Sequence, residues 1–389
     1  MSMTQSSGQP YSGIRIIDLT HDLAAYATRL FADLGADVIR VEPPSGRADR
    51  GGAEAAFTFL NVNKKSVTLD LASDGGIDLL RRLVGSAQVV VYEADADRDR
   101  LLPMLMDVPG PRVVSVVSHF GLTGPYARYL GCDLVDQALG GIAWLSGRSG
   151  EPPLRIGGEQ SWIVTSIYTA VATAAALWDV ELRGARHMLD VSAQEAIAHS
   201  LQNTIQMYDI AGRVTLRGGV NRDAMEGIFA CEDGYVFLSA PPFMGDQWNQ
   251  IIAWMEEDGF PGHRELRDEK WNDRELRTSG VLRDAFKEIF ERFLASKRRA
   301  TIANESIARK ILIAPVSTVA DLPEDRQLAH RAFFTSLSHP DPHRKVMFPG
   351  APYRMSEAAW RLQRPPPGLG ADNAHIGIDV PASVAGEVA

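Results

Sequence analysis

Cysteine is nearly absent from this chain of 389 residues, which contains only Cys132 and Cys231, far apart in sequence. Two distant thiols exclude a disulfide framework and argue against a cysteine-based metal site. They favour a reducing compartment, so the sequence predicts a cytoplasmic protein with no metal site.

Positive charge is also scarce, because 40 Lys and Arg residues face 49 Asp and Glu residues and the formal net charge is −9. Proteins that bind nucleic acid need a basic face that neutralises phosphates. We therefore expect no nucleic-acid partner.

Long hydrophobic runs are missing as well. The longest apolar stretch, residues 163–178, is short for a membrane span and rich in Thr and Ala. The polar N-terminal stretch MSMTQSSGQPYSG lacks the apolar core of a signal peptide. The sequence predicts a soluble protein without a membrane partner.

Strand and helix patterns alternate in the first half of the chain. The runs IRIIDL, ADVIRVE, QVVVYE and RVVSVVS are short and apolar, and amphipathic stretches such as GIDLLRRLVGSA lie between them. This alternation predicts an α/β fold, with a parallel sheet covered by helices on both faces.

The later sequence predicts a smaller α+β domain. IFACEDGYVFLSA is typical of two strands around an Asp-Gly turn, and charged helical patterns follow it. We predict a disordered lead-in over residues 1–12, a large Rossmann-like domain over 13–210 and a linker over 211–225. We also predict a small domain over 226–330 and a C-terminal segment over 331–389 that returns to the large domain.

Several stretches together resemble the class III CoA-transferases, a family that includes formyl-CoA transferase, carnitine CoA-transferase and α-methylacyl-CoA racemase. They are GIRIIDLTHDLAAYATRLFADLGADVIRVEPP, FTFLNVNKKSVTLDL, GLTGPYARYLGCDLVDQALGGIAWLSG, HMLDVSAQEA and DGYVFLSA. The resemblance implies a Rossmann-like large domain, a small domain and two chains interlocked as a dimer. Arg40, Lys64 and Asp18 match family positions that we interpret as architectural.

The resemblance also implies the chemistry, which is transfer of CoA between carboxylates. An aspartate at the start of a helix attacks the acyl-CoA thioester, and the helix N-terminus helps to keep this carboxylate ionised. In RIGGEQSWIVTSIYTAV the aspartate position holds Trp162, which has no nucleophilic oxygen. Glu159 could replace it if the loop folds back, although a solvated residue near a helix cap is the simpler interpretation.

The racemase branch of the family uses a His/Asp pair, and here it is also incomplete. The histidine position of its Gly-His-Asp context is Cys132 in GCD, and the aspartate position is again Trp162. Cys132 is a candidate for moving a proton, with a small buried thiol as the favoured alternative. His119, at a strand end near the expected site, is a further acid–base candidate, with simple packing as the favoured alternative.

The resemblance places the CoA-binding surface on a set of residues that this chain keeps only in part. CoA itself, or an acyl-CoA, is the candidate substrate, and no covalently bound cofactor is expected. The acidic stretch YEADADRDR, where relatives usually carry a phosphate-binding loop, disfavours a polyanionic nucleotide. The candidate CoA contacts are His21, Ala24, Leu69, Arg98, Arg100 and Arg128.

Three functions fit these features. The first is a non-catalytic subunit of a heteromeric CoA-transferase, whose homologous partner carries the aspartate. The second is an enzyme with diverged acyl-CoA or related chemistry, such as hydrolysis, lyase activity or racemase-like proton transfer. The third is a CoA-independent binding or regulatory homodimer.

Overall fold

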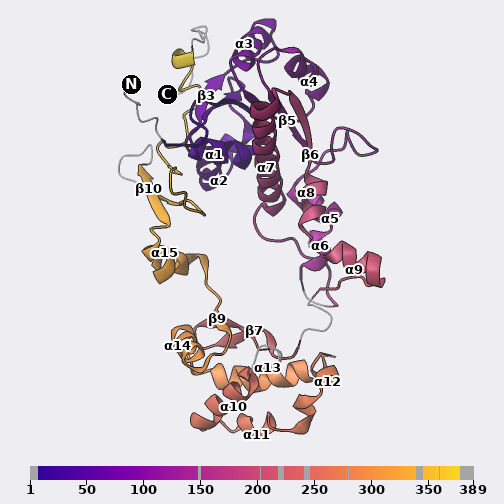
Figure 1. The fold of residues 1–389 in the computed structure, drawn as a ribbon, viewed down its shortest axis with the longest axis vertical. Helices are drawn as coiled ribbons and strands as arrows, with labels where there is room; N and C mark the ends of the chain where they lie inside the picture. The colour runs from indigo at the N-terminus through magenta and orange to yellow at the C-terminus, as the bar shows by residue number, and fades with distance from the viewer. Residues whose placement is uncertain are drawn as a thin grey trace. The chain divides into compact units, whose positions relative to one another are not determined.

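The structure is a computed structural model that describes residues 8–147, 150–201, 203–217, 223–240, 246–278, 280–338, 345–358 and 360–376. It divides into two compact units (Figure 1). The first contains residues 1–144, 154–205 and 327–389, and the second contains 145–153 and 206–326. The described residues do not include 1–7 of the predicted lead-in, 218–222 of the predicted linker or 377–389 of the predicted C-terminal segment. The domain boundaries given by the sequence analysis stay a prediction.

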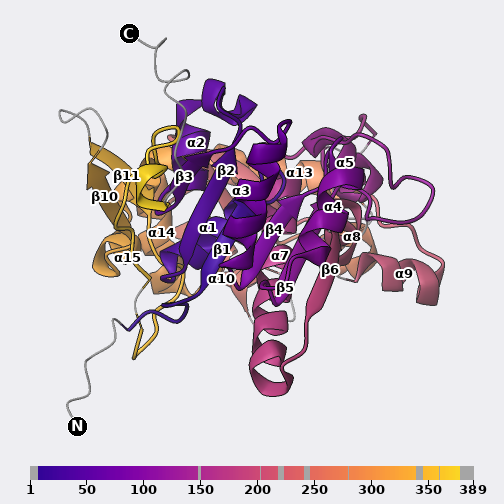
Figure 2. The same ribbon diagram turned by 90° about the horizontal axis from the view of Figure 1, so that it is seen from above.

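A parallel sheet of six strands forms the centre of the first unit (Figure 2). Its order is β3-β2-β1-β4-β5-β6, and every neighbouring pair is parallel. This confirms the predicted α/β fold with a parallel sheet, and the strand order reverses between β1 and β4. The strands are β1 (Arg15–Leu19), β2 (Asp37–Glu42), β3 (Lys65–Thr68), β4 (Val89–Glu93), β5 (Val113–Ser118) and β6 (His187–Ser192).

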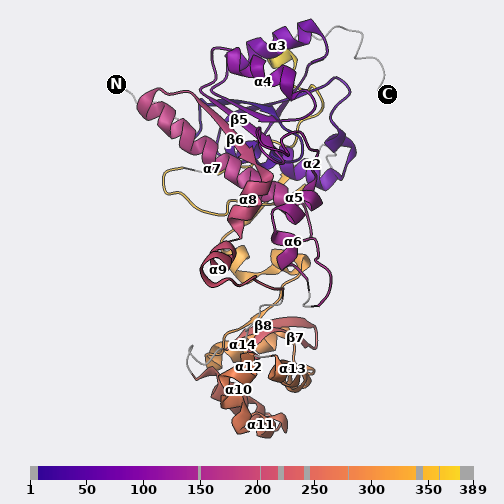
Figure 3. The ribbon, with the colours of Figure 1, turned by 90° about the vertical axis from the view of Figure 1, so that its right-hand side faces the viewer.

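Helices cover both faces of this sheet (Figure 3). Ile17 of β1 packs in one apolar cluster with residues of α3 and α4, whereas Ile16 packs on the opposite face with residues of α1, α7 and α8. The Val-rich strands are therefore buried on both sides, as parallel strands require. The helices of this part are α1 (Ala25–Asp33), α2 (Glu54–Asn61), α3 (Asp74–Gly85), α4 (Arg98–Asp107), α5 (Asp133–Leu139), α6 (Ile142–Leu145), α7 (Gln160–Arg183) and α8 (Ala193–Ser200), with a 3₁₀ turn η1 (Ala48–Gly51). Helix α9 (Thr204–Ala211) begins at the boundary and lies mostly in the second unit.

A buried ionic network joins the first strands. Lys64 Nζ lies 2.8 Å from Asp18 Oδ2, and both side chains are fully buried. The Arg40 guanidinium is also fully buried and lies 2.7 Å from Asp49 Oδ2. Burial of these charges is tolerated because each one has an opposite partner and hydrogen bonds.

The long helix α7 presents small residues to the rest of the unit. Thr165, Thr169 and Thr173 are fully buried, whereas Val171 and Trp178 are exposed. Among the described helices, α7 is the one that is long and apolar enough to cross a membrane. Length and composition also fit a helix packed in a protein, and α7 contacts α1, α8, β5 and β6.

The C-terminal segment lies on the first unit. Backbone N–H groups of β3 at Ser66 and Thr68 donate to the side chains of Asp372 and Asn373 at 2.9 Å. Because β3 is an edge strand, these backbone N–H groups have no neighbouring strand among the described residues to bond with, and the C-terminal side chains pair them instead. The elements of this segment are α15 (Arg326–His330), an antiparallel pair β10 (Phe334–Ser338) and β11 (Lys345–Pro349), and the 3₁₀ turn η5 (Ala374–Ile376).

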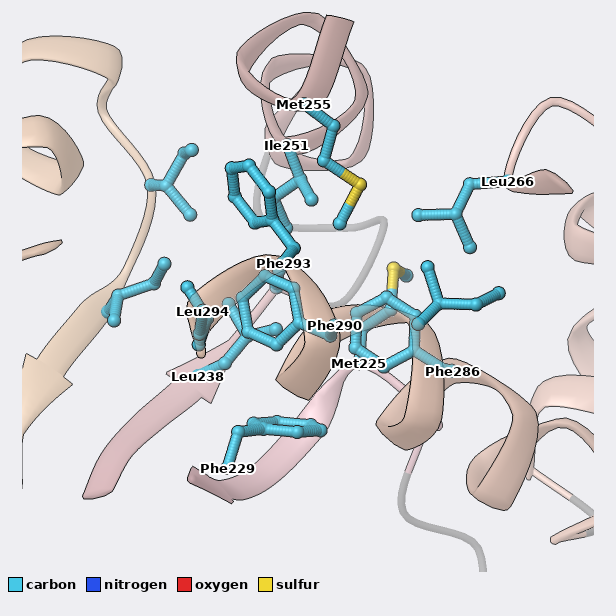
Figure 4. Close-up of a cluster of buried hydrophobic side chains, with 14 of the residues drawn as sticks. Met225, Phe229, Leu238, Ile251, Met255, Leu266, Phe286, Phe290, Phe293 and Leu294 are labelled. Atoms are coloured by element: carbon cyan, nitrogen blue, oxygen red, sulfur yellow. The ribbon is translucent and has the colours of Figure 1, made fainter. Parts of the chain in front are cut away.

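The second unit has its own sheet and apolar core. Strands β7 (Glu226–Cys231) and β8 (Gly234–Ser239) are antiparallel, which confirms the two strands predicted around the Asp-Gly turn, and β9 (Ile313–Pro315) pairs with β8. Phe286, Phe290 and Phe293 of α13 pack against Phe229 and Leu238 (Figure 4). The other elements are α10 (Gln247–Glu257), α11 (Gly262–Glu265), η3 (Glu269–Asn272), α12 (Arg274–Thr278), α13 (Val281–Leu294), α14 (Arg299–Arg309) and η4 (Val319–Glu324).

Candidate active site

A cavity of about 470 Å³ lies at the carboxyl ends of β1, β4 and β5 in the first unit. In open α/β sheets this is where ligands bind, beside the point at which the strand order reverses. Its volume suits a small molecule. The polar and aromatic part of its wall consists of His21, Asp22, Glu93, Asp95, Arg98, Asp99, Ser118, His119, Phe120, Arg128, Tyr129, Cys132 and Trp162.

The cavity brings together six of the ten candidate residues predicted from the sequence. His21, Arg98, His119, Arg128, Cys132 and Trp162 line it. Ala24, Leu69, Arg100 and Glu159 are not part of its wall. Ala24 and Leu69 are buried within the unit, whereas Arg100 and Glu159 are exposed on its surface.

A glutamate supplies the negative charge at the start of α1. Glu93 Oε2 accepts hydrogen bonds from the backbone N–H groups of His21, Leu23 and Ala24 at 3.0, 3.1 and 3.4 Å. His21 Nε2 lies 3.3 Å from Glu93 Oε1. A helix N-terminus attracts anions, and here the chain itself provides one.

Three candidate arginines, Arg98, Arg100 and Arg128, are paired with carboxylates of the acidic stretch. Arg128 Nη1 lies 2.8 Å from Asp99 Oδ2, and Arg98 Nε lies 3.6 Å from Asp99 Oδ1. Arg100 Nη2 lies 3.1 Å from Asp97 Oδ1. These cations would have to exchange carboxylate partners in order to bind a phosphate.

Asp22 adds a further carboxyl group to the cavity wall. Burial raises its pKa, the nearby His21 acts in the opposite direction, and the carboxylate of Glu93 raises it further. The four carboxyl groups in the wall are Asp22, Glu93, Asp95 and Asp99, against two guanidinium groups. The wall therefore favours uncharged over anionic ligand groups.

Trp162 lies in the first turn of α7 and forms part of the cavity wall. Its ring is partly buried against the apolar cluster that contains Ile16, on the face of the sheet covered by α1, α7 and α8. Its indole Nε1 is buried without a hydrogen-bond partner. Glu159 is the N-cap of the same helix, but its side chain is 54% exposed and lies 3.5 Å from Arg155 Nη2.

Asp133, which the sequence interpretation did not single out, holds the start of α7. Its Oδ1 accepts from the backbone N–H and the hydroxyl of Ser161 at 3.0 and 2.7 Å. Its Oδ2 accepts from Gln137 Nε2 at 2.7 Å and from Arg155 Nε at 2.9 Å. Because four donors occupy this buried carboxylate, it stabilises the helix start and is not available as a nucleophile.

His119 lies just after β5 and is paired with a buried aspartate of α5. Its Nδ1 lies 2.9 and 3.0 Å from the two carboxylate oxygens of Asp136, whose side chain is fully buried. Cys132 is the N-cap residue of α5, and its thiol is free and exposed. Asp136 is a second residue of the site that the sequence did not indicate, because 17 positions separate it from His119.

No cluster of three or more His, Cys, Asp or Glu side chains suited to a metal ion occurs in the part of the chain that the structure describes. The cavity wall carries two histidines, four carboxyl groups and one indole.

Comparison with known proteins identifies the family. The model of CoA-transferase family III matches residues 11–373. The chain belongs to CoA-transferase family III. This confirms the resemblance seen in the sequence and shows that the cavity lies in a fold that handles CoA thioesters.

Two curated relatives are named as subunits. Succinyl-CoA:(R)-benzylsuccinate CoA-transferase subunit BbsE of Thauera aromatica is 33% identical over 394 residues, covering 96% of this chain and 94% of the relative. The alpha subunit of succinyl-CoA–L-malate CoA-transferase of Chloroflexus aurantiacus is 25% identical, covering 94% of this chain and 88% of the relative.

Solved structures support the fold. A CAIB/BAIF family protein from Brucella suis superimposes with a TM-score of 0.84 at 25% identity, covering 95% of this chain and 98% of that chain. A hypothetical protein from Mycobacterium tuberculosis has a TM-score of 0.78 at 23% identity and covers the same share of this chain.

Proposed function

We propose that this chain is a subunit of a heteromeric CoA-transferase in which a homologous partner supplies the reactive aspartate. The environment of Trp162 carries this proposal. The residue at the start of α7 that lines the cavity has no carboxylate. Nearby, Asp133 is fully hydrogen-bonded and Glu159 lies outside the cavity wall.

The carboxyl groups of the cavity wall also fit a reactive aspartate that lies on the partner chain. Transfer between two acids needs an ionised carboxylate that can attack a thioester and later leave from the CoA adduct. Of the carboxylates in this wall, Glu93 and Asp95 accept from backbone N–H groups and Asp99 is paired with arginines. Burial raises the pKa of Asp22, which disfavours its ionised form. Two relatives whose printed names include the word subunit add support.

A labelling experiment tests the proposal. The tagged chain is purified from its natural host, and the co-purifying protein is identified by mass spectrometry. The complex and the isolated chain are then incubated with succinyl-CoA, the donor named for both relatives. Hydroxylamine traps carboxylate adducts as hydroxamates.

We expect an adduct on an aspartate of the co-purifying homologue and none on this chain. Recovery of this chain without a homologous partner, or a hydroxamate on one of its own carboxylates, would contradict the proposal. Calorimetry with CoA on the isolated chain separates the two remaining alternatives. A CoA-independent binding protein gives no heat of CoA binding. An enzyme with diverged acyl-CoA chemistry must bind CoA and gives a measurable heat.

A further inference from the structure

The His119–Asp136 pair has the arrangement of an oriented base. An ionised carboxylate only accepts hydrogen bonds, so the two contacts with Asp136 require a proton on His119 Nδ1. In the neutral ring the lone pair then belongs to Nε2. Among the described residues no hydrogen bond reaches Nε2, and the ring lines the cavity.

The backbone around the ring is shaped to hold it. A Cβ atom at Gly131 would lie 2.3 Å from His119 Cγ and 2.4 Å from Nδ1, so only glycine leaves room for the imidazole. On the other side the carbonyl of His119 accepts from the backbone N–H of Gln194 at 3.0 Å. The side chain of His119 is still 22% exposed, so the ring is fixed and accessible.

The indole of Trp162 lies in the wall of the same cavity and carries a hydrogen-bond donor. An indole Nε1–H can only donate, and this one is buried without a partner. An unpaired buried donor is costly unless a ligand oxygen or a water completes it. The wall thus offers one unpaired acceptor on His119, beside an indole whose buried Nε1–H has no partner.

Transfer of CoA between carboxylates uses neither group, because both acids are already ionised at neutral pH. Attack of water on a thioester uses both: a base takes the proton of the water, and a donor stabilises the oxyanion. Two aromatic rings of the wall, Phe120 and Tyr129, supply apolar contacts for an acyl group, and Tyr126 packs against both of them.

We infer that this chain hydrolyses small acyl thioesters in its own cavity, with His119 as the base. Nε2 removes a proton from water while the water oxygen bonds to the carbonyl carbon, and the oxyanion accepts a hydrogen bond from Trp162 Nε1. When the tetrahedral adduct collapses, the carbon–sulfur bond breaks and the thiolate takes the proton from the imidazolium. The products are a carboxylic acid and a thiol, and Asp136 positions the ring throughout.

This activity goes beyond the proposed function, because it replaces the acceptor acid by water and needs no partner chain. The test therefore uses S-phenyl thioacetate, which lacks the nucleotide, beside acetyl-CoA, with loss of thioester absorbance as the measurement on the full chain. H119Q should lower the rate about 100-fold or more, as loss of a general base does. W162F, which keeps an aromatic ring but removes the N–H, should lower it about 100-fold.

Two further variants separate catalysis from folding. H199Q is the matched control, because His199 is a second histidine bonded through Nδ1, to the Tyr168 hydroxyl at 2.7 Å, and it is not part of the cavity wall. It should keep the wild-type rate. In H119G, added imidazoles should restore hydrolysis, and the restored rate should rise with the basicity of the imidazole, which a structural role does not predict.

Absence of thioester hydrolysis by the wild-type chain, or a full rate in H119Q, would overturn the inference. A rate that depends on Cys132 and passes through an acetylated thiol would overturn it as well, since water would not be the attacking group. None of these results affects the adduct expected on the partner chain, so the two proposals fail separately.

Discussion

Asp133 connects α5 to the start of α7 through the hydrogen bonds described above, and nearly all of its side chain is buried. Its role at the residue scale is to supply the negative charge that the N-terminus of a helix attracts. In this chain, therefore, the carboxylate that stabilises the start of α7 is Asp133 of the neighbouring helix α5. The residue of α7 that lines the cavity is Trp162.

Asp133→Ala should lower the free energy of unfolding by about 3 kcal/mol, because it leaves Ser161 and Gln137 without their buried acceptor. Urea denaturation followed by circular dichroism measures the change. Glu159→Ala is the control at the same helix start, and its exposed side chain should contribute less than about 0.5 kcal/mol. Equal losses in the two variants would contradict the role assigned to Asp133.

Gly131→Ala should destabilise the chain by about 1–3 kcal/mol, since the added methyl group overlaps the ring of His119. In a background that carries His119→Gly, which removes the Cβ as well as the ring, the same substitution should cost much less. A double-mutant cycle on unfolding free energies measures this coupling. If the cost is the same in both backgrounds, the contact between Gly131 and the imidazole is not responsible.

The sequence predicted only part of the site at this scale. His119, Cys132 and Trp162 could be named because each is an unusual residue type in a recognisable context. Asp133 and Asp136 could not, since acidic residues in an amphipathic stretch usually face solvent, and only the packing of α5 shows that both carboxylates are buried. The spacing of the two acidic residues in DLVDQAL, three positions apart and thus on one face of a helix, was the available signal.

At the scale of elements, α1 carries a buried acid–base pair. Arg29 Nε donates to Asp33 Oδ2 at 3.2 Å, and Asn63 Nδ2 donates to Oδ1 at 2.7 Å. Burial raises the pKa of Asp33 to about 6, although Arg29 and Asn63 act in the opposite direction. The folded chain therefore holds a proton here at pH values where the unfolded chain has lost it.

A raised carboxyl pKa contributes stability at low pH that is lost as pH rises through the folded value. The unfolding free energy should therefore fall by about 2 kcal/mol between pH 4 and pH 6 from this group, at 1.36 kcal/mol per pKa unit. Asp33→Asn should remove that slope in urea titrations at several pH values. Asp37→Asn is the control, because the pKa of Asp37 is lowered: burial raises it, but bonds to Lys65 and Arg15 outweigh burial. A slope that persists in Asp33→Asn would contradict the prediction.

The elements themselves were predictable where one physical signal dominates. Val-rich runs such as VVVYE become strands buried on both faces, and Asp233-Gly234 lies at the turn between β7 and β8. The sequence did not reveal that Glu93, at the end of β4, bonds the loop before α1. That contact depends on β1 and β4 being neighbours, which the order of the strands in the chain does not fix.

At the scale of the whole molecule, the two units have separate apolar cores. Phe286 lies at the centre of one and Val90 in the sheet of the other, and both are fully buried. Separate cores allow separate unfolding transitions, which a two-state description would not fit.

Phe286→Ala should destabilise the second unit by about 3–5 kcal/mol, and Val90→Ala should destabilise the first by a smaller amount, since fewer buried atoms are removed. Differential scanning calorimetry should show one transition lowered by each variant and the other unchanged. A single transition that moves as a whole in both variants would show instead that the units unfold together.

The contact of Asp372 and Asn373 with β3 has a consequence for protein synthesis. About 300 residues separate these side chains from the strand they serve, so the edge of β3 stays open on the ribosome until the last part of the chain has emerged. An open edge can pair with a strand of another nascent chain. The edge at β3 is thus covered only after residues 372 and 373 are made, and chains truncated before residue 372 should aggregate more than chains that contain them.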